Sequence, residues 1–423
     1  MTTKTSAKLC LASQHFFPTH GGAQLRFLRY LPGLLKRGIE TRVLSGTPKS
    51  KKLIVSEPSV EAKGLSPDEI LSGEPINDIC IERVQLPDKA GWRRSIVFNN
   101  ALLNYCTSAD YRPDVVQVVS SLQPRSIPWV LRLRRLGIPV IYAYTIPATL
   151  PSHPVKRAYR KWTLRNLYRQ LDCMVVGSAE MRDLALDIGV KTRFEVIPNG
   201  VNLKRFRPAH NKAERRSLRA SLGVADHQRM VTTIGAVHPR KGSDVLLEAW
   251  VQLIKQFPQT HLFLVGLRKD LQYPNLNDFR LKLEELIAAS GASEYIHFTG
   301  TVRNPEDYLR ASDVFVFPSM REGLPNAVLE AMASGVPVIL TPFIGLSGDL
   351  GRTNHEYLLA ERDPAVLSAT IARILDSNGL HIKLGNAGRS WVEKTMDLEQ
   401  TLDRYAALYH ELADTGRQRR LSG

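Results

Sequence analysis

The sequence contains few cysteines and no long hydrophobic run. Its 423 residues include four cysteines, which lie far apart at positions 10, 80, 106 and 173 and form no CxxC pair. No histidine accompanies them at the spacing of a zinc site, so we expect buried, reduced thiols and a reducing compartment. No stretch approaches the roughly 18 to 20 apolar residues of a membrane span, and we expect neither secretion nor a transmembrane helix.

Acidic residues are absent from one long segment of the first half. Between Asp114 and Asp172 there is no Asp or Glu, whereas ten Lys and Arg lie between positions 125 and 169. Residues 1–200 contain 29 Lys and Arg against 16 Asp and Glu, while residues 201–423 contain 28 against 25. The uneven charge predicts that the first half of the chain meets an anionic partner.

The run PVKRAYRKWTLRNLYRQL, residues 154–171, places its cations beside aromatic and aliphatic side chains, namely Tyr159, Trp162, Leu164, Leu167 and Tyr168. This pattern is typical of a basic amphipathic helix that lies on an anionic membrane surface. A solvated helix face is the alternative. No nucleic-acid-binding module accompanies the charge, so nucleic acid is not expected as a partner. We therefore predict peripheral contact with an anionic membrane through residues 125–170.

Short β-rich runs alternate with segments long enough for helical crossovers. The runs of the first half are residues 7–13, 40–46, 114–120, 138–144 and 172–178, and those of the second are 229–235, 261–266, 295–300, 313–319 and 336–341. This alternation predicts an α/β fold with two Rossmann-like, doubly wound parallel-sheet domains facing an interdomain cleft. In such sheets, ligands bind at the carboxyl ends of the strands.

We place the domain boundary near residue 207, because the polar segment 207–229 reads as a linker with a short helix. The predicted domains are residues 1–206 and 207–395, followed by a helical segment at 396–423. Residues 49–95 are rich in Lys, Pro, Ser and Glu with weak periodicity, and no element is assigned to them.

The most specific motif is PSMREGLPNAVLEAMASGVPVILT, residues 318–341. It leaves a strand, turns through Glu322, and enters a helix with Pro325 expected at its first position and Gly335 ending it. A helix that starts at such a turn presents backbone N–H groups and a positive dipole end to a phosphate. Glu322 and Glu330 are suited to accept hydrogen bonds from sugar hydroxyls. The alternative is that Glu322 caps the helix and Glu330 is solvated.

This motif resembles the E-x7-E signature of family 4 retaining glycosyltransferases, which have the two-domain GT-B fold. Similar segments occur in the family's order at FFPTHGGAQ (16–24), VVGSAEM (175–181), IPNGVNLKRF (197–206) and IGAVHPRKGSDVLLEAW (234–250). The resemblance covers nearly the whole chain. It implies an acceptor-binding first domain, a nucleotide-sugar-binding second domain, and a C-terminal helix that crosses back to the first.

The resemblance also implies roles for individual residues. Glu330 would bind the ribose hydroxyls, Glu322 the donor sugar, and Lys241 the donor diphosphate, where a fixed cation stabilises the departing nucleotide. Glu322 and Lys241 are thus the candidate catalytic residues. The backbone groups implied to approach the donor belong to Gly21, Gly22, Gly323, Leu324 and Asn326.

Two positions depart from the family pattern. The family usually has an Arg directly after the glycine that ends the first strand of the second domain, and this chain has Ala236 there. Arg240 either substitutes for that cation or faces solvent. The family often carries a His just after the strand at 138–144, where this chain has Thr145. Thr145 remains a candidate contact of the donor sugar.

The activity implied is retaining, metal-independent transfer of a hexose from a nucleotide sugar to a glycan or lipid-linked acceptor in surface polysaccharide or glycolipid assembly. We expect UDP rather than GDP, no metal because no DxD site is present, no cofactor beyond the nucleotide-sugar co-substrate, and a cytoplasmic protein peripheral to the inner face of the cell membrane. The rival interpretations are a degenerate or non-catalytic nucleotide-sugar or glycan-binding protein, which the two departures favour, a nucleotide-sugar epimerase, a phosphorylase, and a glycosidase using the two glutamates.

Overall fold

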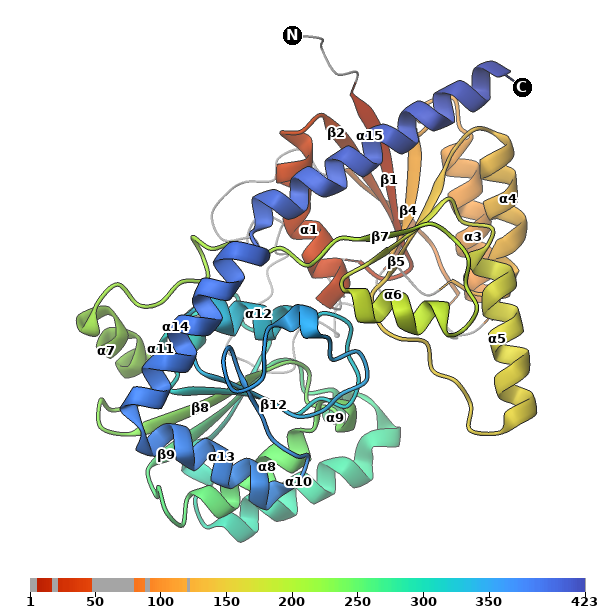
Figure 1. The fold of residues 1–423 in the computed structure, drawn as a ribbon. Coiled ribbons are helices and arrows are strands. Elements are labelled where there is room, and N and C mark those ends of the chain that lie inside the picture. Colours follow the sequence, from red (N-terminus) through yellow and green to blue (C-terminus); the bar gives the residue numbers. More distant parts are fainter. Residues whose placement is uncertain (1–5, 17–21, 48–79, 88–91, 120–121, 423) are drawn as a thin grey trace. The chain divides into compact units, whose positions relative to one another are not determined.

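The computed structural model describes the chain except for residues 1–5, 17–21, 48–79, 88–91, 120–121 and 423. The chain forms two compact units (Figure 1). Unit 1 comprises residues 1–199 and 399–423, and unit 2 comprises residues 200–398. Unit 2 thus begins at Gly200, earlier than the position near residue 207 that the polar segment suggested.

Unit 1 contains a seven-stranded sheet in the order β3-β2-β1-β4-β5-β6-β7, and every neighbouring pair is parallel. Its strands are β1 (Ala7–Ser13), β2 (Ile39–Gly46), β3 (Cys80–Val84), β4 (Val115–Val118), β5 (Val140–Tyr144), β6 (Cys173–Val176) and β7 (Phe194–Val196). The five predicted runs are confirmed as β1, β2, β4, β5 and β6. The edge strands β3 and β7 were not predicted.

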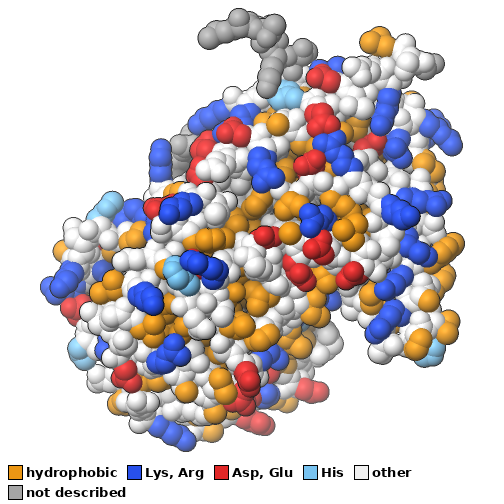
Figure 2. All heavy atoms as spheres, viewed as in Figure 1, with side chains coloured by type: hydrophobic (Ala, Val, Ile, Leu, Met, Phe, Trp, Pro, Cys, Tyr) orange, Lys and Arg blue, Asp and Glu red, His pale blue; other side chains and the backbone are white. Residues whose placement is uncertain are grey.

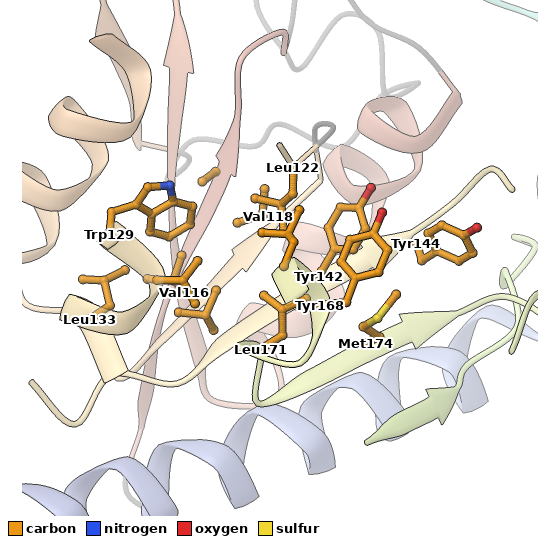
Figure 3. Close-up of a cluster of buried hydrophobic side chains, with 14 of the residues drawn as sticks. Val116, Val118, Leu122, Trp129, Leu133, Tyr142, Tyr144, Tyr168, Leu171 and Met174 are labelled. Carbon is orange, nitrogen blue, oxygen red and sulfur yellow. The ribbon is translucent and has the colours of Figure 1, made fainter. Parts of the chain in front are cut away.

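Helices cover both faces of this sheet, as a doubly wound fold requires. They are α1 (Gly22–Leu35), α3 (Trp92–Cys106), α4 (Ile127–Arg135), α5 (Pro154–Tyr168), α6 (Ala179–Leu186) and α15 (Leu398–Ser422), with a 3-10 turn η2 (Pro124–Ser126). Helices α3 to α6 share one core cluster with alternate strand residues such as Val116, Val118, Tyr142 and Met174 (Figure 3). The intervening strand residues are buried on the other face, because successive side chains of a strand point to opposite sides.

The last helix, α15, is an integral part of unit 1 (Figure 1). The buried Tyr409 hydroxyl donates a hydrogen bond to Gln117 Oε1 at 2.7 Å, on central strand β4. Near the end of the helix, Arg417 and Arg420 both donate to the carboxylate of Asp114, at 3.0 and 2.9 Å. The C-terminal helix expected at residues 396–423 is therefore α15, and it packs as part of unit 1 together with the first half of the chain.

Unit 2 contains a six-stranded parallel sheet in the order β10-β9-β8-β11-β12-β13. Its strands are β8 (Arg229–Ile234), β9 (Thr260–Val265), β10 (Ile296–Gly300), β11 (Val314–Phe317), β12 (Val338–Leu340) and β13 (Leu358–Leu359). The first five confirm the predicted runs, and the two-residue β13 was not predicted. The two parallel α/β sheets therefore confirm the predicted fold class.

The helices of unit 2 include one that follows the segment with Lys241 and one that contains Glu330. They are α7 (Lys212–Ser221), α8 (Ser243–Leu253), α9 (Lys269–Gln272), α10 (Asn277–Ser290), α11 (Pro305–Ala311), α12 (Asn326–Ala333), α13 (Pro364–Asp376) and α14 (Asn378–Thr395). The 3-10 turns are η3 (Pro239–Lys241), η4 (Pro274–Leu276), η5 (Ser293–Tyr295) and η6 (Gly348–Leu350). None of the helices in the described part of the chain combines the length and apolar character needed to span a bilayer.

Two sequence expectations need revision here. The four thiols are unpaired, but Cys80 is exposed at the edge strand β3, whereas Cys10, Cys106 and Cys173 are buried. The unassigned segment 49–95 includes all of β3 and the start of α3, and most of the remainder lies outside the described residues. The pattern of β3 was unreadable because its side chains are mostly exposed, so no hydrophobic periodicity marks it.

A buried ion pair attaches α7 to the sheet of unit 2. Arg219 is 1% exposed, and its guanidinium donates to Asp313 Oδ2 at 3.2 Å and to the Ala311 carbonyl at 2.9 Å. The same Asp313 oxygen accepts from the backbone N–H of Met230 at the start of β8, at 2.8 Å. One carboxylate therefore neutralises a buried cation and joins the segment before β11 to β8.

We predict that Asp313→Ala lowers the free energy of unfolding by about 3–5 kcal/mol, because it leaves the buried Arg219 guanidinium uncompensated. Chemical denaturation followed by circular dichroism measures the loss. The control is Asp226→Ala, whose pair with Arg216 is mostly exposed at both ends, and which should cost less than about 1 kcal/mol. Equal effects of the two substitutions would contradict the prediction.

Unit 2 also buries a histidine pair whose titration affects stability. His261 Nδ1 lies 2.8 Å from His297 Nε2, and His261 Nε2 lies 3.0 Å from Gln228 Oε1. Burial, then the charges of His297 and Arg219, lower the pKa of His261 to about 4. In the unfolded chain the pKa of this histidine is near 6.5. Between that pH and about 4 the unfolded chain binds a proton at this side chain and the folded protein does not, so stability falls as the pH drops through this range.

We predict that the melting temperature of the wild type falls between pH 7 and pH 4.5, and that His261→Gln reduces this fall because it removes the depressed group. Differential scanning calorimetry at matched ionic strength measures both slopes. A variant with the same pH slope as the wild type would show that His261 does not carry the effect.

Candidate functional site

The candidate site lies at the carboxyl ends of two neighbouring strands of unit 2. Strand β8 pairs with β11 in parallel, so the loops that leave both strands emerge at the same sheet edge. The loop after β8 runs through Gly235 and Ala236 into the turn η3, which contains Arg240 and Lys241. The loop after β11 contains Glu322. Residues about 80 positions apart in the sequence thus meet.

The Glu322 carboxylate is the centre of this arrangement. It is 7% exposed, and its Oε1 lies 2.6 Å from Arg240 Nη1 and 2.8 Å from Lys241 Nζ. The Ser319 hydroxyl also donates to this oxygen, at 2.6 Å. Arg240 additionally donates to the Arg321 carbonyl at 2.6 Å. Arg240 therefore does not simply face solvent, because it lies on the same carboxylate as Lys241. That it replaces the missing diphosphate cation stays a prediction.

Close packing of the two loops depends on Gly242. Its φ of +72° disfavours other residues, and a Cβ at this position would lie 2.1 Å from the Pro318 carbonyl oxygen. The backbone N–H of Met320 donates to the Arg240 carbonyl at 2.9 Å. The glycine of the PRKG segment therefore brings η3 against the loop after β11, which sets the two cations beside Glu322.

Sequence reasoning missed two side chains that fix this geometry. Ser319 binds Glu322 directly, and Arg362 donates to the carbonyls of Pro318 at 3.3 Å and Pro239 at 3.4 Å. Both residues act on backbone or on a neighbouring side chain rather than through a recognisable motif. Only the PS dipeptide at the strand end gave any signal for Ser319, and none marked Arg362.

The electrostatics favour an anion in front of Lys241. Burial lowers the pKa of the Lys241 ammonium, although the carboxylate of Glu322 opposes that shift. The ammonium also lies 5.0 Å from the centroid of the Phe317 ring. Burial and the nearby cations Lys269, Arg240 and Lys241 lower the pKa of His238 as well. This corner of unit 2 therefore disfavours further positive charge.

A small pocket opens beside Lys241. Gly235, Ala236, Lys241, Ser243 and Phe317 are among its lining residues. Ala236, the position where the family usually has an Arg, borders this space with a methyl group only. The pocket thus adjoins the Lys241 side chain at the end of β8.

Glu330, the second motif glutamate, lies in α12 and is 7% exposed. It is therefore buried, contrary to the alternative of a solvated side chain. Pro325 was expected at the first position of the helix, but it is the N-cap, and α12 begins at Asn326. The N–H of Glu322 is also occupied, since it donates to the Ile344 carbonyl at 3.0 Å, so this group is not directed at a ligand.

The other loop candidates lie around these two glutamates. Gly323 and Leu324 fall between Glu322 and the N-cap of α12, Leu324 is buried, and Asn326 is the first helical residue. The loop thus connects the cation-bound carboxylate to the helix that carries Glu330.

The remaining candidates belong to unit 1. Gly22 is the first residue of α1, and a Cβ there would meet nothing within 4 Å. Gly21 lies outside the described residues. Thr145 directly follows β5 and is half-buried, and the Tyr144 hydroxyl accepts a hydrogen bond from the Ala148 N–H at 2.7 Å. Gly22 and Thr145 therefore both lie at ends of elements of unit 1, where sheet ligands bind.

The predicted basic helix forms as α5, but its apolar residues are divided differently than expected. Leu164, Leu167 and Tyr168 are buried in the core of unit 1 and cannot contact a membrane. Figure 3 shows Tyr168 within this core. Tyr159 and Trp162, at 66% and 55% exposure, point outward and stack with ring centroids 6.2 Å apart. The exposed surface of α5 therefore combines cations with one aromatic pair.

Within the described ranges, no three His, Cys, Asp or Glu side chains are grouped so that they could hold a metal ion.

Comparison with protein families covers both units. Residues 21–200 match the model "Glycosyl transferase 4-like domain", and residues 214–391 match "Glycosyl transferases group 1". Unit 1 and unit 2 are thus each represented by a glycosyltransferase model.

Among curated proteins, the chain is 28% identical over 260 residues to the lipopolysaccharide core biosynthesis mannosyltransferase LpsB of Rhizobium meliloti, covering 61% of this chain and 70% of LpsB. It is 25% identical over 393 residues to the lipopolysaccharide core biosynthesis glycosyltransferase LpsD of the same organism, covering 93% and 96%. Among solved structures, Anabaena HepE in complex with UDP and glucose superimposes with a TM-score of 0.72 at 16% identity, covering 95% and 99%. The fold, both family models and these relatives agree: the chain belongs to the family 4 glycosyltransferases and has their GT-B fold.

Proposed function

We propose that this glycosyltransferase moves a hexose from a nucleotide sugar, with UDP as the nucleotide, to a hydroxyl of a glycan or lipid-linked acceptor, with retention of anomeric configuration. The observation that carries the proposal is the pair of cations on the buried Glu322 carboxylate, at the sheet edge where parallel α/β folds bind ligands. The relatives LpsB and LpsD act in lipopolysaccharide core biosynthesis, which supports a role in surface polysaccharide or glycolipid assembly.

In this mechanism, Lys241 and Arg240 bind the donor diphosphate. Their charges stabilise the negative charge that builds on the phosphate as the glycosidic bond to the sugar breaks. Glu322, released in part from its cations, accepts hydrogen bonds from the donor sugar. Glu330 accepts hydrogen bonds from the ribose hydroxyls, and the loop of Gly323, Leu324 and Asn326 lies against the phosphate.

The acceptor hydroxyl attacks the anomeric carbon on the face from which the nucleotide leaves. Its proton passes to the leaving phosphate, so no protein nucleophile is needed and positioning dominates the catalysis. Two cations beside the diphosphate supply the charge stabilisation that a metal ion supplies elsewhere. We therefore propose metal-independent transfer. Gly21, Gly22 and Thr145 are the proposed contacts from unit 1.

Helix α5 is the proposed membrane contact. Its first half is exposed, from Pro154 to Tyr159, and Val155 is 71% exposed. Figure 2 shows basic and hydrophobic side chains interspersed over this helix. A segment without acidic residues is attracted to anionic lipids, and an exposed Tyr–Trp pair is suited to the headgroup region. We propose that the chain works at the inner face of the cell membrane.

We predict that purified protein slowly releases free nucleotide from one member of a panel of UDP-, GDP- and ADP-sugars. Lys241→Ala should lower kcat about 100- to 1000-fold, because it removes the cation that stabilises the leaving phosphate. Glu330→Ala should act mainly by raising KM, because it removes a ground-state contact to the ribose. Nucleotide release with and without a chelating agent measures both effects and the need for a metal.

The controls are Lys255→Ala and Glu285→Ala, two exposed positions of unit 2. Both should retain the wild-type rate. A wild type that binds donors but never turns them over, even with lipid-linked acceptors present, would favour the nucleotide-sugar-binding protein that Ala236 and Thr145 keep in consideration.

We predict that the protein sediments with vesicles containing anionic phosphatidylglycerol and not with neutral phosphatidylcholine vesicles. Replacing both Tyr159 and Trp162 by Ser should weaken sedimentation about tenfold or more, because the interfacial aromatic pair is lost while all cations remain. The exposed Tyr273 of unit 2 serves as the control substitution, Tyr273→Ser. Equal sedimentation with both kinds of vesicle would rule out this contact.

A further inference from the structure

The loop after β9 lies beside the loop that carries Ala236. The backbone N–H of Val237 donates to the Leu267 carbonyl at 2.9 Å, and Val237 forms a parallel bridge with Arg268. The polypeptide immediately after β9 is thus paired with the residue that follows Ala236. Two cations in this loop, Arg268 and Lys269, therefore sit close to the position where the family's usual Arg is missing.

Arg268 is not available to a ligand. Its Nε donates to Asp270 Oδ1 at 2.8 Å, its Nη2 lies 2.5 Å from Asp270 Oδ2, and its guanidinium covers the Phe298 ring at 4.0 Å. Asp270 is itself 3% exposed. This cation is neutralised and packed, so its role is to support the loop.

Lys269 differs from its neighbour. It is half-buried, and no carboxylate lies within ion-pair distance of its ammonium among the residues that the structure describes. Burial lowers the pKa of Lys269, and the cations Arg240 and Lys241 lower it further. Three cations thus share a corner that contains a single site carboxylate, Glu322. A half-buried cation without a carboxylate partner is unfavourable, and this favours the binding of an anionic ligand.

We propose that Lys269 is a binding residue for the donor diphosphate and that it supplies, from the loop after β9, the positive charge that Ala236 does not. The inference rests on the proposed function and adds to it a residue outside the family motif. The bridge between Val237 and Arg268 places Lys269 one residue beyond the partner of Val237, which itself directly follows Ala236. The diphosphate is then held by Lys241, Arg240 and Lys269.

The test is calorimetric binding of UDP, GDP and ADP to the full chain, with the matching nucleoside monophosphates for comparison. Lys269→Met should weaken binding of the preferred diphosphate about 10- to 100-fold, as expected for the loss of a hydrogen bond to a charged group, and should affect the monophosphate less. Lys269→Arg should retain most of the affinity. Adding Ala236→Arg to Lys269→Met should restore it, because the cation returns from the neighbouring loop.

Stability separates a binding role from a structural one. Lys269→Met should melt no lower than the wild type, because it removes a desolvated cation that faces two others. Lys255→Met, at an exposed position after α8, is the matched control and should change neither affinity nor melting.

The outcomes distinguish the two proposals. A wild type that binds no nucleoside diphosphate would overturn the proposed function together with this inference. A wild type that binds, with Lys269→Met equally tight or with no rescue by Ala236→Arg, would leave the proposed function in place and overturn the role of Lys269. A lower melting temperature of Lys269→Met with equal losses for mono- and diphosphate would likewise overturn it.

Discussion

The ion pairs of Glu322 are the interaction on which the candidate site depends. A carboxylate at 7% exposure requires neutralisation, and Arg240, Lys241 and the Ser319 hydroxyl all meet its Oε1. This oxygen holds the two cations close together despite their mutual repulsion. A diphosphate would be a second anion for the same cations. The carboxylate thus preorganises the charges that the proposed reaction needs, without movement of the backbone.

That interaction is possible only because of the sheet. Parallel pairing of β8 with β11 brings two loop regions to one edge, and Gly242 lets them approach to backbone contact. Arg362 then joins the carbonyls of both loops. Lys269 arrives by the same rule, since β9 is the parallel neighbour of β8 on its other side. The topology therefore collects cations from two strand ends and the carboxylate from a third.

The sequence predicted the central strands because their hydrophobic runs are buried on both faces, as in β11 and β12. Edge strands escaped for the opposite reason: β3 is largely exposed, and β13 has two residues. The helix of residues 154–171 was recognised, but which of its apolar side chains face the core was not. Leu164 and Trp162 both stand as apolar positions between cations in the sequence, and only packing against the sheet shows that the first is buried and the second exposed.

The site was predictable where a motif carries it and not elsewhere. Glu322, Glu330 and Lys241 stand in a family pattern, and the structure gathers Glu322 with Lys241. The partner of Arg240 was undecided, because the direction of an arginine next to the motif lysine depends on where the loop after β11 lies. Arg362 binds the Pro239 carbonyl 123 positions away, and Ser319 donates not only to the nearby Glu322 but also to the Arg240 carbonyl 79 positions away. No local pattern reports such long-range contacts.

Unit 2 handles buried charge in two ways, and the contrast bears on function. Around Asp313, the carboxylate is matched by Arg219 and Arg215 and by a backbone donor, and the cluster lies away from the strand ends that bind ligands. Around Glu322, one carboxylate likewise meets two cations, but a third cation, Lys269, lies near them with no carboxylate within ion-pair distance among the described residues. Selection for stability alone favours the first arrangement, since an unmatched half-buried cation lowers stability. The excess positive charge at the ends of β8 and β9 is therefore best explained by a ligand that carries the missing negative charge.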